Sequence, residues 1–149
     1  MSENHPKVRL VHTELIDVVR ETATPLRKAD EAAALLRGLI GGRDRECFAV
    51  LHLDACNRVI TGEIVSVGHL TAALVHPREV YKAAILQNAA AIICGHNHPS
   101  GDLQPSAEDT AIFERLSAAG QILGVELIDF LVITGEGHLA YSEHPPKTP

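Results

Sequence analysis

Apolar residues gather into short runs that predict β-strands. Residues 47–53 (CFAVLHL) form a nearly continuous apolar run, which is typical of a strand buried on both faces. Residues 59–67 (VITGEIVSV) follow a turn-like segment and predict the returning strand of a hairpin. Residues 90–94 (AAIIC) predict a second buried strand. Two later segments, 125–133 and the short 139–142, predict further strands.

Three other segments carry helix signals. Residues 29–40 are rich in Ala and Leu, and the glycines at 41 and 42 provide a stop. Residues 77–88 begin with a proline, which suits the first turn of a helix. A third helix begins at Ser106 and places apolar residues at helical spacing, namely Ile112, Leu116, Ala119 and Leu123. Strands interleaved with helices predict an α/β domain with a mixed sheet.

The composition indicates one globular domain. The chain has 149 residues, of which 46% are apolar, enough for a core of Ala, Val, Ile and Leu. The formal net charge of −6 argues against a basic nucleic-acid-binding surface. The pattern shows neither a signal peptide nor the ~18 consecutive apolar residues of a membrane span. Cys47, Cys56 and Cys94 form no C-x-x-C pair, so we expect reduced thiols and a cytoplasmic protein.

One segment, residues 95–109 (GHNHPSGDLQPSAED), carries the candidate chemistry. His96 and His98 stand at the end of a predicted strand, where alternation puts both imidazoles on the same side. Asp109 falls in the first turn of the next predicted helix, and the connecting loop can return its carboxylate to the two rings. Two imidazoles and one carboxylate are a normal ligand set for catalytic zinc, which keeps its fourth position for water. Zinc lowers the pKa of such a water to about 7 and so makes it a nucleophile.

Other interpretations of these residues stay open. Ser106 and Asp109 also match a capping box, in which the serine caps the helix and the acid stabilises its first turn. A histidine near a strand end is often only structural. The letters His96-Asn97-His98 suggest an HNH nuclease, but such sites draw their residues from separate parts of a ββα element. A zinc deaminase would need H-x-E followed by P-C-x-x-C, and the chain has neither.

The spacing H-x-H, seven residues, S, two residues, D resembles the metal signature of the JAB/JAMM (MPN+) zinc metalloprotease family. Here it falls on His96, His98, Ser106 and Asp109. The wider similarity covers residues 26–143 and is to the RadC-like branch in its short, single-domain form. The matching segments are 42–46, 53–54, 57–60, 76–79 and 96–101, with Pro105 and Ser106. The resemblance implies a JAB/JAMM-type, cytidine-deaminase-like α/β fold, in which helices flank a mixed β-sheet.

The resemblance also implies an activity and further site residues. Enzymes of this family hydrolyse peptide or isopeptide amide bonds with a zinc-activated water, and a glutamate on an earlier strand acts as general acid and base. Glu63, in the second predicted strand, occupies the matching place. Its competitors are Glu46, Asp54 and Glu79, of which the last two have local explanations at a turn and a helix terminus. Ser106 is implied to stabilise the oxyanion or to orient the water. The implied zinc ligands are His96, His98 and Asp109.

Some positions depart from the RadC-like pattern. The late strand of the family usually reads D-H-x-I-I, whereas this chain has Phe130 after Asp129. Losing an outer-shell partner of a metal site can cost ~10–100-fold in affinity or activity. His69 stands where the family usually has threonine, and we expect an exposed loop residue that could reach the cleft. His52, inside a buried strand, is expected to be a hydrogen-bonded core residue.

Partners and boundaries follow from this interpretation. The leading function has a peptide or protein substrate, and we expect neither a membrane nor direct nucleic-acid binding. The alternative is a non-catalytic zinc-containing accessory protein linked to DNA repair or a mobile element, which Phe130 favours. We expect an N-terminal extension over 1–25, the domain over 26–143 and a disordered tail over 144–149. The pattern over 8–20 fits either a strand or a helix.

Overall fold

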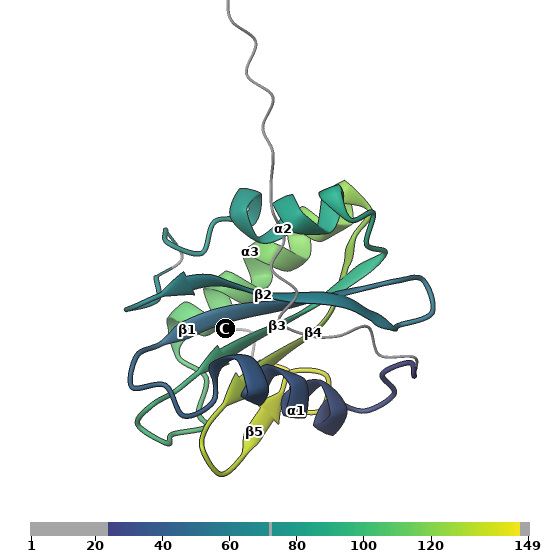
Figure 1. Ribbon diagram of the computed structural model, residues 1–149. Coiled ribbons are helices and arrows are strands. Elements are labelled where there is room, and N and C mark those ends of the chain that lie inside the picture. The colour runs from purple at the N-terminus through teal and green to yellow at the C-terminus, as the bar shows by residue number, and fades with distance from the viewer. Residues whose placement is uncertain (1–23, 72, 147–149) are drawn as a thin grey trace, which may run out of the picture.

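The computed structural model describes residues 24–71 and 73–146. These residues form a five-stranded mixed sheet with helices on both faces (Figure 1). The elements are α1 (Ala29–Ile40), β1 (Cys47–Leu53), β2 (Val59–Val67), α2 (Pro77–Leu86), β3 (Ala91–Asn97), α3 (Ala107–Leu123), β4 (Glu126–Ile133) and β5 (His138–Ala140). The predicted fold class, α/β with a mixed sheet flanked by helices, is confirmed.

The strands lie in the order β2-β1-β3-β4-β5. β1 pairs antiparallel with both β2 and β3, whereas β3 and β4 run parallel and are connected through α3. β5 is the antiparallel partner of β4. A parallel pair needs a crossover rather than a tight turn, so the chain must leave the end of β3 and return along the sheet as a helix. This crossover brings the end of β3 close to the start of α3.

Alternation along β1 divides the core into two halves. Cys47, Ala49 and Leu51 pack with the apolar side of α1, whereas Phe48 and Val50 pack with α2 and α3 on the other face. Figure 1 shows the resulting three layers, with the sheet in the middle. Every residue of β1 is buried, as its continuous apolar run predicts.

The predicted elements are present with small changes at their ends. The helix predicted over 29–40 and the strands predicted over 47–53 and 59–67 have those bounds in the structure. α2 ends earlier than predicted, at Leu86, whereas β3 continues to Asn97 because its pairing with β4 continues that far. β4 and β5 lie where strands are predicted.

Several expectations concern the ends of the chain and one buried residue. The pattern over 8–20 and most of the extension predicted over 1–25 lie outside the described residues, as do the last three residues of the predicted tail. Among the helices of residues 24–71 and 73–146, none is long and apolar enough to cross a membrane. His52 is confirmed as a hydrogen-bonded core residue, since it is fully buried with its Nδ1 3.1 Å from Thr61 Oγ1.

Candidate metal centre

Three potential metal ligands meet where β3 ends and α3 begins. His96 lies near the end of β3, His98 follows its last residue, and Asp109 lies in the first turn of α3. One potential ligand atom from each side chain lies within 4.8 Å of the other two. His96 and Asp109 are buried and His98 is partly buried, with the two rings edge to face and their centroids 4.7 Å apart. The structure therefore brings the three predicted ligands together.

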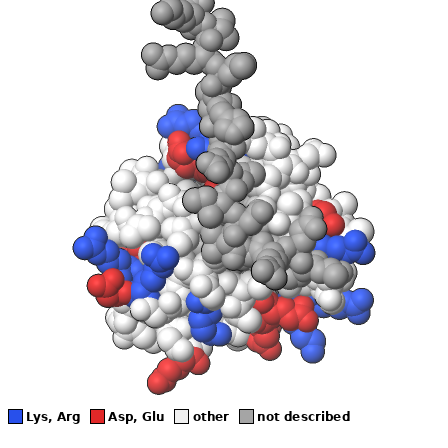
Figure 2. Space-filling view, viewed as in Figure 1, with Lys and Arg blue, Asp and Glu red and all other residues white. Residues whose placement is uncertain are grey.

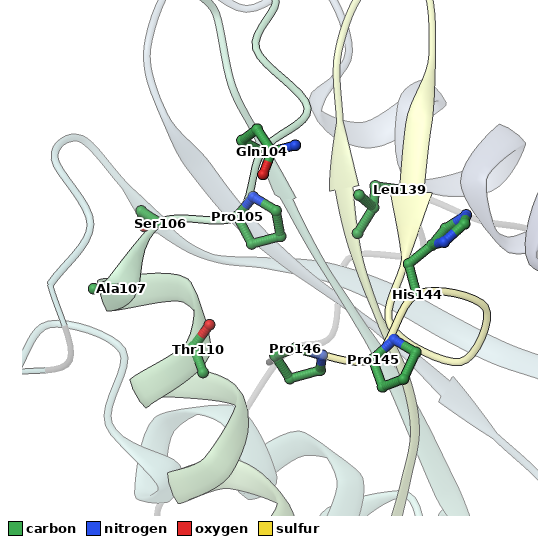
Figure 3. Close-up of a pocket in the computed structure, with 9 residues that line it drawn as sticks. All are labelled: Gln104, Pro105, Ser106, Ala107, Thr110, Leu139, His144, Pro145 and Pro146. Atoms are coloured by element: carbon green, nitrogen blue, oxygen red, sulfur yellow. The ribbon is translucent and has the colours of Figure 1, made fainter. Parts of the chain in front are cut away.

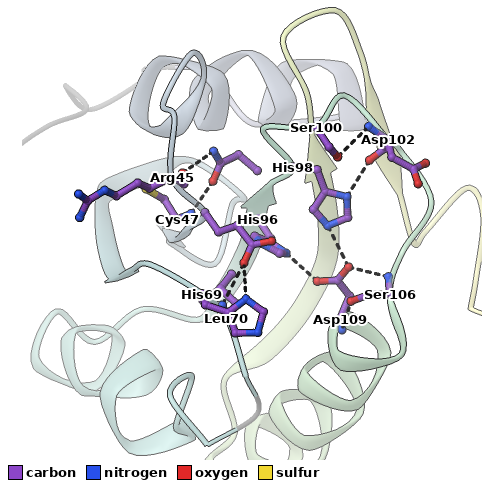
Figure 4. A network of polar contacts seen from close by, with 12 residues as sticks. Arg45, Cys47, His69, Leu70, His96, His98, Ser100, Asp102, Ser106 and Asp109 are labelled. Carbon is purple, nitrogen blue, oxygen red and sulfur yellow. Dashed lines mark hydrogen bonds and ion pairs between the residues drawn. The ribbon is translucent and has the colours of Figure 1, made fainter.

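Asp109 is at the centre of the polar contacts of this group (Figure 4). Its Oδ1 lies 2.6 Å from His96 Nδ1, and its Oδ2 lies 3.1 Å from His98 Nε2. The backbone N–H of Ser106 donates to the same Oδ2 at 2.8 Å. Burial raises the pKa of Asp109, but the hydrogen bonds from His96, His98 and Ser106 outweigh burial and hold that pKa well below its ordinary value. Asp109 is therefore ionised near neutral pH, as a metal-ligating carboxylate must be.

Ser106 and Asp109 also form the capping box that their spacing predicts. Ser106 Oγ accepts from the backbone N–H of Asp109 at 3.0 Å, while the Asp109 carboxylate accepts from the backbone N–H of Ser106. The cap and the metal group share the Asp109 carboxylate. Its Oδ1 contacts His96, and its Oδ2 contacts both the Ser106 backbone and His98. The two interpretations are therefore compatible, and the cap aims Asp109 at the histidines.

Both ring nitrogens of His98 have partners. Nδ1 lies 2.7 Å from the backbone carbonyl oxygen of Asp102, which can only accept, so Nδ1 carries the proton of this bond. In the neutral imidazole this leaves the Nε2 lone pair for a metal ion. The hydrogen bond with Asp109 raises the pKa of His98. A metal ion would displace the Nε2 proton, because only the neutral ring is a ligand.

The second nitrogen of His96 tests whether these residues suit a metal ion. Its Nε2 is buried and has no hydrogen-bond partner within residues 24–71 and 73–146. A buried nitrogen without a partner costs free energy unless an ion or a water satisfies it. Two imidazoles and an ionised carboxylate are also the nitrogen and oxygen donors that zinc prefers. The donor set and the unsatisfied nitrogen both fit a zinc ion.

Glu46 supplies a further carboxylate at the side of this group. It directly precedes β1, and Phe48 in β1 pairs with His96 in β3, so the start of one strand lies beside the end of the other. Glu46 Oε1 is 4.0 Å from His96 Nε2. Its Oε2 accepts from the backbone N–H of Leu70 at 3.1 Å and lies 3.5 Å from Nδ1 of the exposed His69. The loop after β2 therefore holds one carboxylate oxygen of Glu46 while the other lies toward the metal group.

Glu63, the glutamate implied by the family resemblance, contacts a different histidine. It lies opposite Val50, which is in turn opposite Cys94, so β1 separates Glu63 from the metal-binding strand. Its Oε1 lies 3.5 Å from His52 Nε2, and burial raises the pKa of its carboxyl group. The carboxylate beside the predicted ligands is therefore that of Glu46, which the sequence offered only as a competitor.

The other two acidic competitors have the structural roles expected of them. Asp54 Oδ1 accepts from the backbone N–H groups of Cys56 at 2.8 Å and Arg58 at 2.9 Å, within the turn between β1 and β2. Glu79 lies in the first turn of α2 and forms exposed ion pairs within that helix. Of the four acidic candidates, Glu46 is the one that contacts a predicted ligand.

Phe130, which stands in place of the usual histidine of the family, belongs to the core. It is fully buried, and its ring centroid lies 5.9 Å from that of Phe48, 6.1 Å from that of Phe113 and 5.0 Å from that of Tyr141. The phenylalanine therefore fills an aromatic cluster between the sheet and α3. Packing in this cluster accounts for a phenylalanine at position 130. These contacts give no particular support to the alternative that the protein is non-catalytic.

A pocket of about 480 Å³ opens beside Ser106 (Figure 3). Pro105, Ser106 and Thr110 line one side, and Leu139 with residues 144–146 lines the other. Ser106 belongs both to this pocket and to the capping box with Asp109. A group bound in the pocket would therefore reach Ser106, whereas none of His96, His98 and Asp109 lines the pocket.

Charged side chains of both signs are interspersed on the visible surface. On the face shown in Figure 2, basic side chains lie near acidic ones instead of forming one continuous basic area.

Comparison with known proteins identifies the family. A model of the RadC-like JAB domain matches residues 26–145. A UPF0758 protein of Rubrobacter xylanophilus is 44% identical over 130 residues, which cover 87% of this chain and 57% of that protein. A UPF0758 protein of Symbiobacterium thermophilum is 45% identical over 130 residues, which cover 84% of this chain and 56% of that protein. A UPF0758 protein of Methanosarcina acetivorans is 40% identical over 119 residues, which cover 80% of this chain and 52% of that protein.

The fold and the His–His–Asp group define an α/β domain of the JAB type with a candidate metal centre. The chain belongs to the RadC-like JAB domain family. It spans about half the length of the curated relatives it matches. The names of these relatives state no activity, so the activity has to be inferred from the residues of the centre.

Proposed function

We propose that this protein is a zinc-dependent metallopeptidase or isopeptidase that hydrolyses an amide bond with a zinc-activated water. The observation that supports this best is the position of Glu46 Oε1, 4.0 Å from His96 Nε2 at the edge of the His–His–Asp group. A structural metal site does not need a carboxylate held at its side, whereas a hydrolytic site needs a proton acceptor there. Zinc, when bound, lowers the pKa of a water to about 7 and polarises the substrate carbonyl.

In this proposal, His96, His98 and Asp109 hold the zinc ion and Glu46 moves the proton. Glu46 Oε1 accepts a proton from the attacking water as the new C–O bond forms. The same oxygen then gives that proton to the leaving amine nitrogen as the C–N bond breaks, so the carboxylate is regenerated. The N–H of Leu70 occupies Oε2, which supports Oε1 as the oxygen that exchanges the proton.

Ser106 is the second catalytic residue of the proposal. Its Oγ accepts the helix-capping bond, and that bond leaves the hydroxyl hydrogen able to donate to an oxyanion. Removing one oxyanion donor typically lowers kcat ~10²–10³-fold. The adjoining pocket would take the residues of a peptide or protein substrate beside the cleaved bond.

A reducing compartment is the proposed location. Cys47, Cys56 and Cys94 are all free, and two of them are buried in the core. Structural disulfides are common in secreted proteins and rare in the cytoplasm. The free thiols therefore support a cytoplasmic protein.

The test compares Glu46→Gln with Glu63→Gln. Zinc-loaded protein is incubated with a peptide library and with isopeptide-linked lysine peptides, and the products are identified by mass spectrometry. We expect hydrolysis by the wild type and a loss of ~10²–10⁴-fold in kcat in Glu46→Gln, with zinc retained. Glu63→Gln should keep most of the activity, because Glu63 contacts His52 and not the metal group.

Each alternative outcome has a separate meaning. Full activity in Glu46→Gln would exclude Glu46 as the general base. A loss confined to Glu63→Gln would restore the residue first expected from the family resemblance. Absence of hydrolysis by zinc-loaded wild-type protein over the whole library would count against a peptidase.

A further inference from the structure

The side chain of Asn97 connects the metal-binding strand to the segment that carries Glu46. Asn97 is the last residue of β3, and only 4% of it is exposed. Its Oδ1 accepts from the backbone N–H of Cys47 at 2.5 Å, and its Nδ2 donates to the backbone carbonyl oxygen of Arg45 at 2.9 Å. One side-chain amide thus uses both its acceptor and its donor on the same short segment.

These two bonds fix the backbone on both sides of Glu46. The Arg45 carbonyl belongs to the peptide group that precedes Glu46, and the Cys47 N–H belongs to the peptide group that follows it. Because φ and ψ are the only soft backbone dihedrals of a residue, anchoring both peptide groups sets the direction of the Glu46 side chain. The carbonyl of Glu46 also accepts from the N–H of Gly68 at 2.8 Å.

Strand alternation explains why a residue next to two metal ligands can do this. His96 and Asn97 are consecutive residues of β3, so their side chains point to opposite faces of the sheet. The histidine faces Asp109, while the asparagine reaches the start of the neighbouring strand β1. The tripeptide at 96–98 therefore carries ligands on one side and an anchor for the Glu46 backbone on the other.

We propose that Asn97 is a positioning residue that holds the Glu46 carboxylate beside the metal group by fixing the backbone over 45–47. The proposal rests on the proposed function, in which Glu46 is the general base. Displacing a catalytic group by about 1 Å can cost ~100-fold in rate. Loss of the Asn97 amide should therefore lower kcat ~10–100-fold, with little change in KM or in zinc content.

Two variants and one control test the proposal. Asn97→Ala removes both bonds, whereas Asn97→Asp keeps the acceptor and loses the donor. The control is Thr134→Val, because Thr134 is as buried as Asn97 and its Oγ1 also makes two backbone bonds, both with Gly137 in the turn after β4. Those bonds lie in a different turn from the Glu46 segment. Thermal unfolding of all three shows that each variant is folded, and Asn97→Asp carries the test if Asn97→Ala is not.

The first readout needs neither metal nor activity. It is the amide NMR resonance of Leu70, whose N–H donates to Glu46 Oε2. We expect Asn97→Ala to move this resonance toward its position in Glu46→Ala, where the acceptor is missing, and Thr134→Val to leave it in place. A purely structural Asn97 would change the resonance of Cys47 alone, and that result would overturn the proposal.

The second readout is kcat of the zinc-loaded protein. The double variant Glu46→Gln/Asn97→Ala should be no slower than Glu46→Gln, because Asn97 acts through Glu46. Losses that add in the double variant would show an effect independent of Glu46 and would also overturn the proposal. If the wild type hydrolyses no substrate, the proposed function fails, while the Leu70 resonance still decides whether Asn97 positions Glu46.

Discussion

Phe48 is the register partner of His96 in the antiparallel pair formed by β1 and β3. Glu46 stands just before β1, so its carboxylate lies beyond the end of this pairing, 4.0 Å from Nε2 of His96. On the other side of the same ring, Asp109 Oδ1 lies 2.6 Å from Nδ1. His96 is therefore held between two carboxylates, one preceding β1 and one at the start of α3. A metal ion at this group would connect the end of β3 to the start of α3, beside the segment that precedes β1.

Zinc should stabilise the folded protein through this connection. We expect about one zinc ion per chain in the wild type and almost none in His96→Ala, measured by elemental mass spectrometry. A ligand present at 1,000 times its Kd adds about 4 kcal/mol to the free energy of unfolding. Chelation should therefore lower the Tm of the wild type and leave that of His96→Ala unchanged.

The matched control for zinc binding is His138→Ala. His138 is another strand histidine, partly buried, but it pairs with Asp30 and lies outside the metal group. This variant should keep its zinc and its response to chelation. Equal zinc content in wild type and His96→Ala would contradict the assignment of His96 as a ligand.

Ser106→Ala should weaken both the helix and the metal group. The change removes the acceptor for the Asp109 N–H, and loss of such a cap costs ~0.5–2 kcal/mol. Urea unfolding of the chelated protein measures this cost without a contribution from zinc. Ser106→Thr keeps the hydroxyl and should retain most of the stability. If the alanine and threonine variants unfold alike, the cap contributes nothing.

How far the sequence predicts this site depends on whether its residues share one segment. His96, His98 and Asp109 lie within residues 95–109, so strand alternation and the following helix are enough to bring them together. The acidic partner could not be chosen in this way. Glu46 directly precedes the predicted hairpin and Glu63 lies in its second strand, and local patterns do not say which hairpin strand pairs with β3.

The strand order decides between the two glutamates. β3 pairs with β1, which brings Glu46 to His96 and leaves Glu63 one strand away beside His52. A usable signal was present in the sequence. Residues 47–53 are more continuously apolar than residues 59–67, which favours a central position for β1 and therefore a partner on each side. The role of Asn97 had no such signal, because it depends on contacts with residues about fifty positions away.

His52 should make stability fall in mild acid. Burial lowers the pKa of His52 from 6.5 to about 4. The unfolded state therefore binds a proton first, so the stabilisation is present above about pH 6.5 and is lost as the pH falls toward 4. The expected loss from this group between pH 7 and pH 5 is about 2 kcal/mol. Glu63, whose pKa burial raises above its ordinary value of 4.5, opposes this change, because the folded state binds the proton of that carboxyl group before the unfolded state does.

Urea unfolding at the two pH values measures this effect. His52→Gln should show a smaller difference between pH 7 and pH 5 than the wild type, whatever its stability at pH 7. His144→Gln replaces an exposed histidine and should keep the wild-type difference. The same difference in all three proteins would show that His52 is not protonated on unfolding in this range.

Gly95 should not tolerate a side chain, because α1 packs against β3 at this residue. A Cβ on Gly95 would lie 2.7 Å from Leu36 Cδ1 and 2.9 Å from Cδ2, and Leu36 is fully buried. Gly95→Ala should therefore lower the free energy of unfolding by ~1–3 kcal/mol. Because His96 is the next residue, zinc affinity should fall as well.

Removing Leu36 should compensate for the new methyl group. Leu36→Ala alone should cost ~2–5 kcal/mol, since it leaves a cavity in the core. In the double variant Leu36→Ala/Gly95→Ala, the methyl group of residue 95 occupies part of that cavity. The double variant should therefore lose less free energy of unfolding than the two single variants lose in total. Gly38→Ala is the control, because a Cβ there meets nothing within 4 Å and a helix favours alanine over glycine by up to about 1 kcal/mol. The free energy of unfolding of each variant is measured in urea. If the losses from Leu36→Ala and Gly95→Ala simply add in the double variant, contact with Leu36 is not what excludes a side chain at residue 95.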